Sequence, residues 1–381
     1  MKLVAQIKLQ PSAQQRDLLK ATLERANAAC NAINDYAWVH KTFSQYPLHK
    51  ALYYDIKGQF ELTAQMVVRC LSKVADAYKK DHDSKCNFSK YGSIAYDERI
   101  LSYYTQKGVV SIWTLAGRQQ IPYVCGKRAK GLLLNQKGES DLLYHRGEFY
   151  LLATCELSEP TPKEVDEYLG VDRGIINIAT DSDGNIYQGA RVERRRKRFA
   201  KQRQSLQKKG TKSAKRKLRK ISGKQARFQK DVNHCTAKEL VKRAKRTKRG
   251  VAIENLKGIN LRTRVRRQDR DRRGNWSFAQ LGDYITYKAA LYGVLLRKVD
   301  PCYTSQRCAE CGHVEKSNRL SQSEFLCKAC GHQAHADVNA ARNVSWVAVN
   351  RPIVSDTTKD RGSARGKPSA LVHPCGTAGG R

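Results

Sequence analysis

The sequence lacks the features of an exported or membrane-inserted protein. Its first ten residues show no signal-peptide pattern, and no apolar run approaches the length that crosses a bilayer. Apart from one cluster, its 12 cysteines are irregularly spaced and do not describe a secreted disulfide framework. No internal repeat is apparent. We therefore expect a folded protein of a reducing, intracellular compartment, and 381 residues suffice for two or three domains.

Acidic residues are scarce relative to basic ones. The chain has 35 Asp and Glu against 72 Lys and Arg, a formal net charge of +37. Residues 191–249 hold 26 basic and three acidic residues, a net +23, and seven more arginines lie between Arg262 and Arg273. Self-repulsion of this size disfavours a compact state unless a polyanion neutralises it. The alternatives are a solvated basic face and a nuclear-localisation run, which needs only a handful of these residues. We therefore predict nucleic-acid binding.

The first 160 residues have the pattern of a β-rich domain with a helical insertion. Alternating apolar residues predict a strand over residues 2–10, and Ser12 with Gln15 has the form of a capping box that begins a helix. Apolar residues at helical spacing predict a second helix over residues 60–78. Short strands separated by glycines follow over residues 93–157.

These patterns predict a β-barrel-like domain of residues 1–10 and 91–160, interrupted by a helical domain of residues 11–90. A pair of prolines marks its end. Residues 351–381, rich in Gly, Ser, Thr and Pro, are expected to be disordered.

Two carboxylates follow or belong to predicted strands of a second domain. Residues 169–172 and 175–180 are predicted strands, so Asp172 lies at a strand end, where a lone Asp is more often a turn residue. Residues 251–256 are apolar on both faces, which is typical of a buried parallel strand. Glu254 would lie on a buried face, where an unpaired carboxylate costs on the order of several kcal/mol. It therefore needs a cation partner or a raised pKa.

A third carboxylate, Asp337, begins the apolar stripe of a predicted helix that continues to Ala341 and Val344. None of the three carboxylates has a basic residue in its own stripe, which suggests a shared metal site. Magnesium takes oxygen ligands, and a pair of Mg²⁺ ions promotes phosphodiester hydrolysis by activating a water and stabilising the leaving oxygen. An Asp on the first strand, a Glu on a later strand and an Asp on the last helix is the order of RNase H-like nucleases.

Four cysteines precede that helix with the spacing of a zinc site, namely Cys308-x2-Cys311-x15-Cys327-x2-Cys330. Four thiolates fill a tetrahedral shell, so we predict one structural Zn²⁺ without a catalytic role. His313, His332 and His335 are alternative ligands that a filled shell does not require. The module, residues 301–333, lies between a predicted strand of residues 293–300 and the helix that carries Asp337, so we expect it at the lip of the carboxylate site.

Several motifs resemble TnpB, the family of RNA-guided nucleases encoded by small bacterial and archaeal insertion sequences. They are "GVDRGIINIATDSDG", "GVAIENLKG", "VDPCYTSQRCAECG" and "FLCKACGHQAHADVNAARN", in the family's order. The resemblance is strongest from Leu169 to Asn343, and the N-terminal half fits the family's layout more loosely. It implies a multidomain α+β and α/β protein: a wedge β-barrel with a helical recognition domain, then an RNase H-like (RuvC) domain of residues 161–300 and 334–350 with an inserted four-Cys zinc finger.

The resemblance also implies partners and site residues. TnpB proteins bind a guide RNA from the element end and cleave both strands of double-stranded target DNA beside a short adjacent motif, with one RuvC-type site. That site is implied to be Asp172, Glu254 and Asp337, with two Mg²⁺ per active site. Arg173 stands where many members have leucine, a variation not expected to affect metal binding. A cytoplasmic, nucleoid-associated prokaryotic protein, monomeric with its RNA, is expected.

Three alternatives stay open. A miniature type V CRISPR effector shares this arrangement, although the short chain and compact helical insert favour TnpB. A nuclease-inactive RNA-guided repressor typically loses one carboxylate, and this chain has all three. A DDE transposase shares the fold but does not ordinarily carry a zinc loop beside its last acid.

Overall fold

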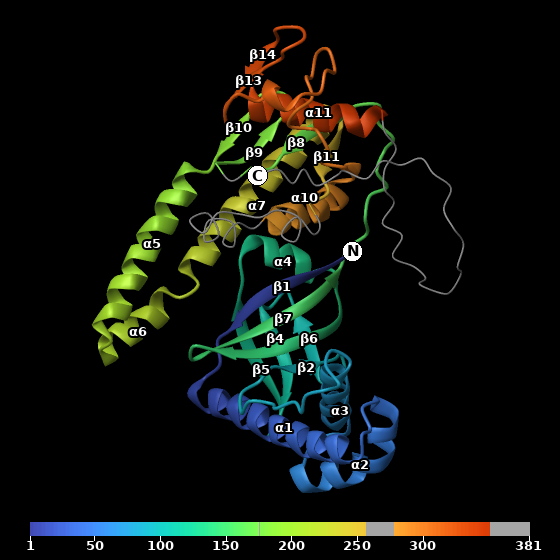
Figure 1. Ribbon diagram of the computed structural model, residues 1–381. Coiled ribbons are helices and arrows are strands. Elements are labelled where there is room, and N and C mark those ends of the chain that lie inside the picture. The colour runs from blue at the N-terminus through green and yellow to red at the C-terminus, as the bar shows by residue number, and fades with distance from the viewer. Residues whose placement is uncertain (175, 257–277, 351–381) are drawn as a thin grey trace. The chain divides into compact units, whose positions relative to one another are not determined.

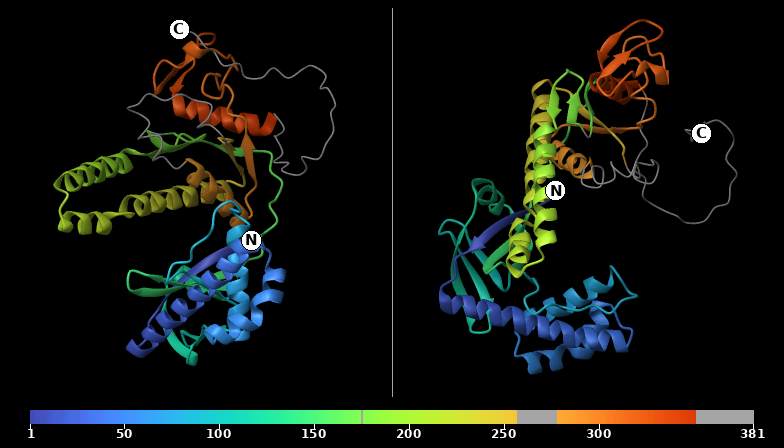
Figure 2. Two further views of the ribbon diagram at one scale, coloured as in Figure 1. Left: turned by 60° about the horizontal axis from the view of Figure 1, so that its bottom comes forward. Right: turned by 60° about the vertical axis from the view of Figure 1, so that its left-hand side comes forward.

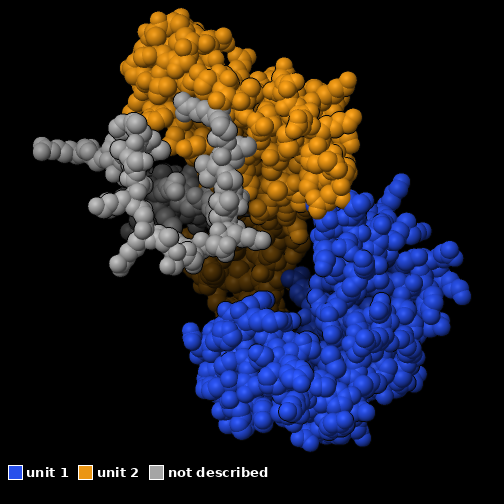
Figure 3. Space-filling model, turned by 90° about the vertical axis from the view of Figure 1, so that its right-hand side faces the viewer, with its two compact units in different colours: residues 1–158 blue, residues 159–381 orange. Residues whose placement is uncertain are grey.

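The structure is a computed structural model that describes residues 1–174, 176–256 and 278–350. The chain divides into two compact units, Met1–Ser158 and Glu159–Arg381 (Figure 3). The tail predicted to be disordered and the arginines between Arg262 and Arg273 lie outside the described residues. Among the described helices, none has both the length and the apolar character needed to cross a bilayer.

Unit 1 contains a seven-stranded antiparallel sheet in the order β2-β6-β7-β1-β5-β4-β3 (Figure 1). The hydroxyl of Tyr103 on β3 lies 2.9 Å from that of Ser140 on β6, so the sheet curls until it is nearly closed. This is the β-barrel-like sheet that the sequence predicts. Its strands are β1 Lys2–Leu9, β2 Ile94–Tyr96, β3 Leu101–Tyr104, β4 Val109–Thr114, β5 Gly117–Val124, β6 Gln136–His145 and β7 Glu148–Glu156.

Three helices lie between β1 and β2 in the chain: α1 Ala13–Val39, α2 Gln45–Phe60 and α3 Ala64–Tyr78. A short helix, α4 Lys127–Leu133, joins β5 to β6. The predicted capping box begins α1, because Ser12 Oγ accepts from the amide of Gln15 and Gln15 Oε1 accepts from the amide of Ser12. The predicted helix over residues 60–78 is wrong at its start. Phe60 ends α2, and Glu61 has the left-handed conformation (φ 49°) that terminates this helix before α3 begins.

Unit 2 contains a five-stranded sheet in the order β10-β9-β8-β11-β12. β11 runs parallel to both β8 and β12, whereas β8, β9 and β10 are antiparallel. The parallel strand predicted around Glu254 is therefore confirmed. Two of the predicted strands are shorter than expected. The strand predicted over residues 175–180 begins at Asn177, and the strand predicted over residues 293–300 spans four residues. The strands are β8 Tyr168–Asp172, β9 Asn177–Asp181, β10 Ile186–Gln188, β11 Gly250–Glu254 and β12 Leu296–Val299.

Helices cover both faces of this sheet (Figure 1). Odd-numbered residues of β8 and β11, such as Val171 and Ile253, pack with α7 (Lys224–Arg246) and α10 (Phe278–Tyr292). Even-numbered residues pack with α11 (Ala336–Asn350) on the opposite face. Since side chains alternate along a strand, Asp172 and Glu254 both belong to the α11 face.

Helix α11 lies directly on β8 at a glycine. A Cβ on Gly170 would be 2.0 Å from the carbonyl oxygen of Ala341 and 2.6 Å from the amide nitrogen of Ser345. Ser345 Oγ also donates to the carbonyl of Tyr168 at 2.6 Å. Only glycine permits this close approach, which fixes the height of the helix above the strand.

The basic segment forms three helices, α5 Ala190–Lys209, α6 Lys212–Ile221 and α7, which together make a hairpin that projects from the sheet of unit 2 (Figure 2). Of its first two helices, α5 buries only Val192 and α6 only Ala214. Their basic side chains are therefore available to solvent or to a partner.

Candidate active site and metal centre

The fold brings the three predicted carboxylates to one edge of the sheet of unit 2. Val171 of β8 pairs with Ile253 of β11, so Asp172 and Glu254 follow side by side at the carboxyl ends of two parallel strands. Asp337 lies in the first turn of α11, on the face of the sheet toward which both side chains are directed, and is 3% exposed. The three carboxylates are close enough to interact electrostatically.

Burial governs the protonation of this centre. Burial, followed by the negative charges of Glu254 and Asp337, raises the pKa of Asp172 to about 8. Arg319 and Arg173 act in the opposite direction. Burial also raises the pKa of Glu254. Both shifts extend the protonated form of these carboxyls to higher pH than for a solvated Asp or Glu.

Hydrogen bonds fix the orientation of two of the carboxylates. Thr304 Oγ1 donates to Glu254 Oε1 at 2.6 Å, which lowers the raised pKa of Glu254. Asn177 Nδ2, at the start of β9, donates to Asp337 Oδ2 at 2.9 Å. Neither residue was predicted from the sequence, because a single Thr or Asn has no distinctive local pattern.

Two arginines lie near the carboxylates in the folded protein. Neither belongs to the stripe of residues that carries a carboxylate in the sequence. Arg319 Nη2 lies 3.1 Å from Asp337 Oδ1, and Arg319 belongs to the cysteine module, between Cys311 and Cys327. Arg173 follows Asp172 directly and is buried. The stripes themselves contain no basic residue, as the sequence indicates, and tertiary packing brings both cations to the carboxylates from outside them.

The four cysteines converge as a metal site requires. Their sulfur atoms all lie within 4.8 Å of one another, with Cys308 and Cys330 at 3.8 Å and Cys311 and Cys327 at 3.5 Å. They are the group of His, Cys, Asp and Glu side chains in the described part of the chain whose ligand atoms converge in this way. Four thiol donors in this arrangement fit a structural zinc ion.

Backbone geometry shapes each half of the cysteine cluster. Gly312 and Gly331, one residue after the second Cys of each pair, have φ of +78° and +72°. Each donates its amide to the carbonyl of the first Cys of its pair, at 3.1 and 3.0 Å. Burial raises the pKa of Cys327, but the amides of Cys330 and Ala329 and the neighbouring thiols outweigh it and lower this pKa to about 6. A thiolate is the form that binds metal.

The histidines considered as alternative ligands are held elsewhere or play no part in the cluster. His313 Nε2 lies 3.1 Å from Glu315 Oε2, and His335 Nδ1 accepts from the amide of Asp337 at 3.2 Å. The compact group contains none of the three histidines.

Two buried asparagines attach the cysteine module to α11. Asn339 Oδ1 accepts from the amide of Ala309 at 2.9 Å, and Asn339 Nδ2 donates to the carbonyl of Arg307 at 2.8 Å. Asn343 Nδ2 donates to the carbonyls of Thr304 and Arg307. The helix that carries Asp337 is thus also the support of the module. Two Asn four residues apart on a buried stripe are a signal that could have been found in the sequence.

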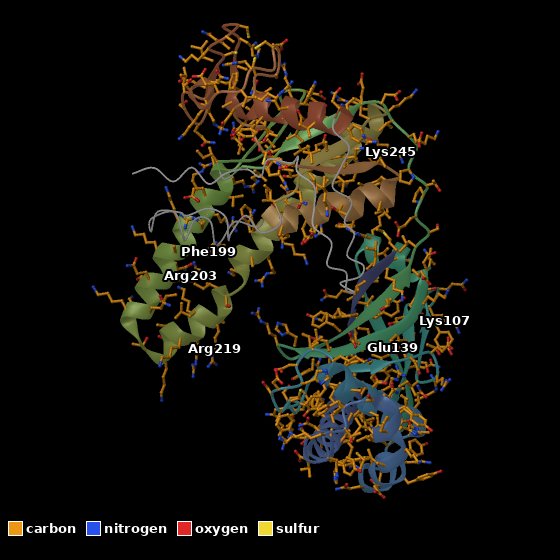
Figure 4. All side chains as sticks on the ribbon, turned by 45° about the vertical axis from the view of Figure 1, so that its right-hand side comes forward. Lys107, Glu139, Phe199, Arg203, Arg219 and Lys245 are labelled. Carbon is orange, nitrogen blue, oxygen red and sulfur yellow. The ribbon has the colours of Figure 1, made fainter. Side chains whose placement is uncertain are left out.

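The basic hairpin has aromatic residues among its cations. Helices α5 and α6 carry 16 Lys and Arg against one acid, Glu193. The guanidinium carbon of Arg195 lies 4.7 Å from the ring centre of Phe228 and 5.9 Å from that of Phe199. Figure 4 shows Phe199, Arg203 and Arg219 on this hairpin. Such a surface suits a phosphate backbone.

Two family models match the chain. One described as "Probable transposase" matches residues 153–264, which include Asp172 and Glu254. One described as "Cas12f1-like, TNB domain" matches residues 278–344, which include Asp337 and the four cysteines.

Curated relatives match parts of the chain. The Cas12f1 endodeoxyribonuclease of Sulfoacidibacillus thermotolerans is 45% identical over 85 residues, which are 22% of this chain and 20% of the relative. The putative RNA-guided DNA endonuclease InsQ of Escherichia coli K12 is 32% identical over 218 residues, 52% of this chain and 53% of the relative. A TnpB-like protein of Methanocaldococcus jannaschii is 29% identical over 197 residues, 48% and 69% respectively. The chain thus spans about half, or less, of the first two relatives.

Solved structures show a similar fold. A mini-RNA-guided endonuclease, CRISPR-Cas_phi3, superposes with a TM-score of 0.57 at 8% identity, over 93% of each chain. A Cas12f1–sgRNA–target DNA complex gives a TM-score of 0.54 at 18% identity, over 87% of this chain and 81% of the other. At these identities the likeness concerns the fold alone.

The cysteine cluster predicts a dependence of folding on metal. Replacing Cys308 or Cys327 with Ser is expected to lower zinc content below the one ion per chain expected of the wild type, and to lower the unfolding temperature, since structural zinc contributes directly to folding. Elemental analysis and thermal unfolding measure both. Cys235→Ser, at an exposed cysteine of α7, is the control and should change neither. Wild-type protein that is free of metal yet equally stable would contradict the assignment.

The raised pKa of Asp172 predicts a pH-dependent gain in stability on its removal. A carboxyl with a higher pKa in the folded than in the unfolded state, about 3.9, opposes folding increasingly as pH rises from about 4 to about 8. At about 1.4 kcal/mol per pKa unit, Asp172→Asn should therefore stabilise Mg²⁺-free protein by roughly 5 kcal/mol at pH 8, and by roughly 1–2 kcal/mol at pH 5. Denaturant unfolding at both pH values measures it.

Asp183→Asn is the matched control, because Arg249 lowers the pKa of Asp183. Its loss should destabilise the protein at pH 8. Equal unfolding free energies for wild type and Asp172→Asn at both pH values would show that the pKa of Asp172 is not raised in the folded protein.

Proposed function

We propose that this chain is a TnpB-family protein, related also to the Cas12f effectors, and that it is an RNA-guided endonuclease that cuts double-stranded DNA. The observation that carries the proposal is the convergence of Asp172, Glu254 and Asp337 at the carboxyl edge of one sheet. Named relatives are RNA-guided DNA endonucleases and endodeoxyribonucleases, which supports the same reaction class.

We further propose that unit 2 is an RNase H-like, RuvC-type domain in which these three side chains bind two Mg²⁺ ions. Carboxylate oxygens are the ligands that Mg²⁺ prefers, so the donor set fits. Bound Mg²⁺ would supply an activated water and stabilise the leaving oxygen of the scissile phosphodiester.

The chain's own residues then have distinct tasks. Thr304 and Asn177 orient the carboxylates of Glu254 and Asp337. Arg319 pairs with Asp337, and its guanidinium would be available to a phosphate oxygen if Asp337 held a metal ion. The four cysteines would hold one Zn²⁺ as a purely structural ion.

The remaining parts would bind nucleic acid. We propose that the hairpin of α5, α6 and α7 follows the backbone of the guide–target duplex, holding phosphates without reading bases. In this scheme the sheet of unit 1 is the wedge domain and α1–α3 the recognition domain. The guide RNA would come from the element end, and a short motif beside the target would be read in the DNA duplex, in the cytoplasm of a prokaryote.

Two other functions remain testable alternatives. Cas12f relatives favour a miniature type V CRISPR effector equally well by sequence. A nuclease-inactive repressor is disfavoured by the three intact carboxylates. Sequencing the RNA that co-purifies with the protein separates an element-end transcript from a CRISPR RNA.

Cleavage is expected to depend on all three carboxylates as one unit. Asp172→Ala, Glu254→Ala or Asp337→Ala should each reduce cutting of both strands by about a hundredfold or more, while binding of guide RNA and target persists because affinity resides in base pairing and phosphate contacts. The assay supplies guide RNA, a matched plasmid with a permissive adjacent motif, and Mg²⁺ or Mn²⁺. Ca²⁺ should not support cutting, since its longer bonds and looser geometry suit this catalysis poorly.

Glu239→Ala, at an exposed carboxylate of α7, is the matched control and should cut at the wild-type rate. If Glu254→Ala still cuts one strand at the wild-type rate, a second active site exists and the single-site proposal is wrong.

RNA binding is expected to depend on the charge of the hairpin. Replacing the exposed Arg203, Lys208, Arg216 and Arg219 with Ala should weaken RNA binding irrespective of sequence and reduce the slope of log K against log salt, by roughly 0.7–0.9 for each lost phosphate contact. Binding titrations at several salt concentrations measure the slope. Gln204→Ala with Gln207→Ala alters α5 of the same hairpin without changing its charge and should leave the slope unchanged. A slope unaffected by the four charge-removing changes would mean that the hairpin is only a solvated face.

A further inference from the structure

Arg173 is a buried cation next to the carboxylate centre. It is 7% exposed, follows Asp172 directly, and its Nη2 donates to the backbone carbonyl of Glu254. Its charge interacts with Glu254, Asp172 and Asp283. A guanidinium loses much hydration when it is buried, so its presence here requires compensation from these neighbours.

The structure makes room for this guanidinium on the far side of the sheet. Arg173 has the odd-numbered parity of Val171, so it leaves the strand toward α10, opposite to Asp172. A Cβ added to Gly282 of α10 would lie 2.5 Å from Arg173 Nη1. Glycine at position 282 thus forms a cradle into which the guanidinium fits beneath the ends of β8 and β11.

The formal charge of the centre limits the metal it can hold. Three ionised carboxylates contribute −3, and Arg173 with Arg319 contributes +2, which leaves −1 when Asp283, a solvent-exposed neighbour of Arg173, is not counted. One divalent ion would bring the centre to +1 and a second to +3. A second ion is therefore strongly opposed until the phosphates of a nucleic acid add negative charge.

We propose that Arg173 is a resident cation and positioning residue that weakens divalent-metal binding at this centre until DNA is present. This inference rests on the proposed metal site of Asp172, Glu254 and Asp337. It replaces the expectation that arginine in place of leucine at position 173 has no effect on metal binding. The charge of Arg173 repels a divalent ion twice as strongly as it repels a proton. Removal of this charge should therefore strengthen metal binding most at a pH where protons do not compete with the metal for the carboxylates.

In the test, zinc-loaded protein without RNA or DNA is titrated with Mn²⁺ at pH 8.5. The concentration of free Mn²⁺ is measured by electron paramagnetic resonance. Wild-type protein should bind at most one Mn²⁺ per chain at this site, and Asp172→Asn should abolish that binding. Arg173→Gln keeps a donor for the Glu254 carbonyl but loses the charge, and should bind Mn²⁺ at least about tenfold more tightly. Arg173→Lys retains the charge and should restore wild-type affinity.

Arg297→Gln is the matched control. The guanidinium of Arg297 lies 4.7 Å from the ring centre of Tyr168 and donates to the carbonyl of Ala348, at the other end of α11 from Asp337. Its removal should leave Mn²⁺ affinity unchanged. If thermal unfolding shows that Arg173→Gln does not fold, Arg173→Met is titrated in its place.

Unchanged or weaker Mn²⁺ binding in a folded Arg173→Gln or Arg173→Met protein would overturn the proposal. So would equal tightening in Arg297→Gln, which would show a general effect of net charge. Because the titration contains no nucleic acid, failure to cut DNA leaves this result intact. Absence of any Asp172-dependent Mn²⁺ binding in wild type and variants would instead overturn the metal site and this inference together.

Discussion

The contact of α11 with β8 at Gly170 is the constraint on which the site depends. The helix backbone occupies the space that any other side chain at position 170 would fill. At that height the first turn of α11 carries Asp337 over the strand ends that carry Asp172 and Glu254. The same helix holds the cysteine module through buried Asn339, so a displaced helix would move the third carboxylate and the module together.

The centre balances two opposed physical requirements. Burial excludes water but raises the pKa of Asp172 and Glu254, which disfavours the ionised form that binds metal. Arg319 and Arg173 offset part of that effect from opposite faces of the sheet. Each added cation also repels metal, so the same arginines that keep carboxylates ionised limit how many ions can enter. Stability in the free protein and occupancy by metal are therefore linked through a small number of charges.

Local sequence patterns predicted those features that depend on periodicity. A segment that is apolar on both faces identified the parallel strand of Glu254, and the pKa of this buried carboxyl is raised, with Arg173 and Arg319 acting on it as nearby cations. Paired cysteine spacing predicted the sulfur cluster. The arginines could not be predicted, because 72 basic residues leave no local sign of which two will lie beside the carboxylates. The break at Glu61 was hidden too, since apolar spacing continues across it while one backbone conformation ends the helix.

The adjacency of the cysteine module and Asp337 follows from how the module is held. Four thiolates leave a zinc ion no open position, so the module acts on the site through its protein contacts. Asn343 binds the carbonyl of Thr304, and the Thr304 hydroxyl in turn binds Glu254. From within the module, Arg319 reaches Asp337 directly. One folded loop thereby fixes the surroundings of two carboxylates that come from different strands and helices. A chain that placed its cysteines far from Asp337 would need separate supports for each, whereas here Asn339 and Asn343, on the helix that carries Asp337, hold the module directly.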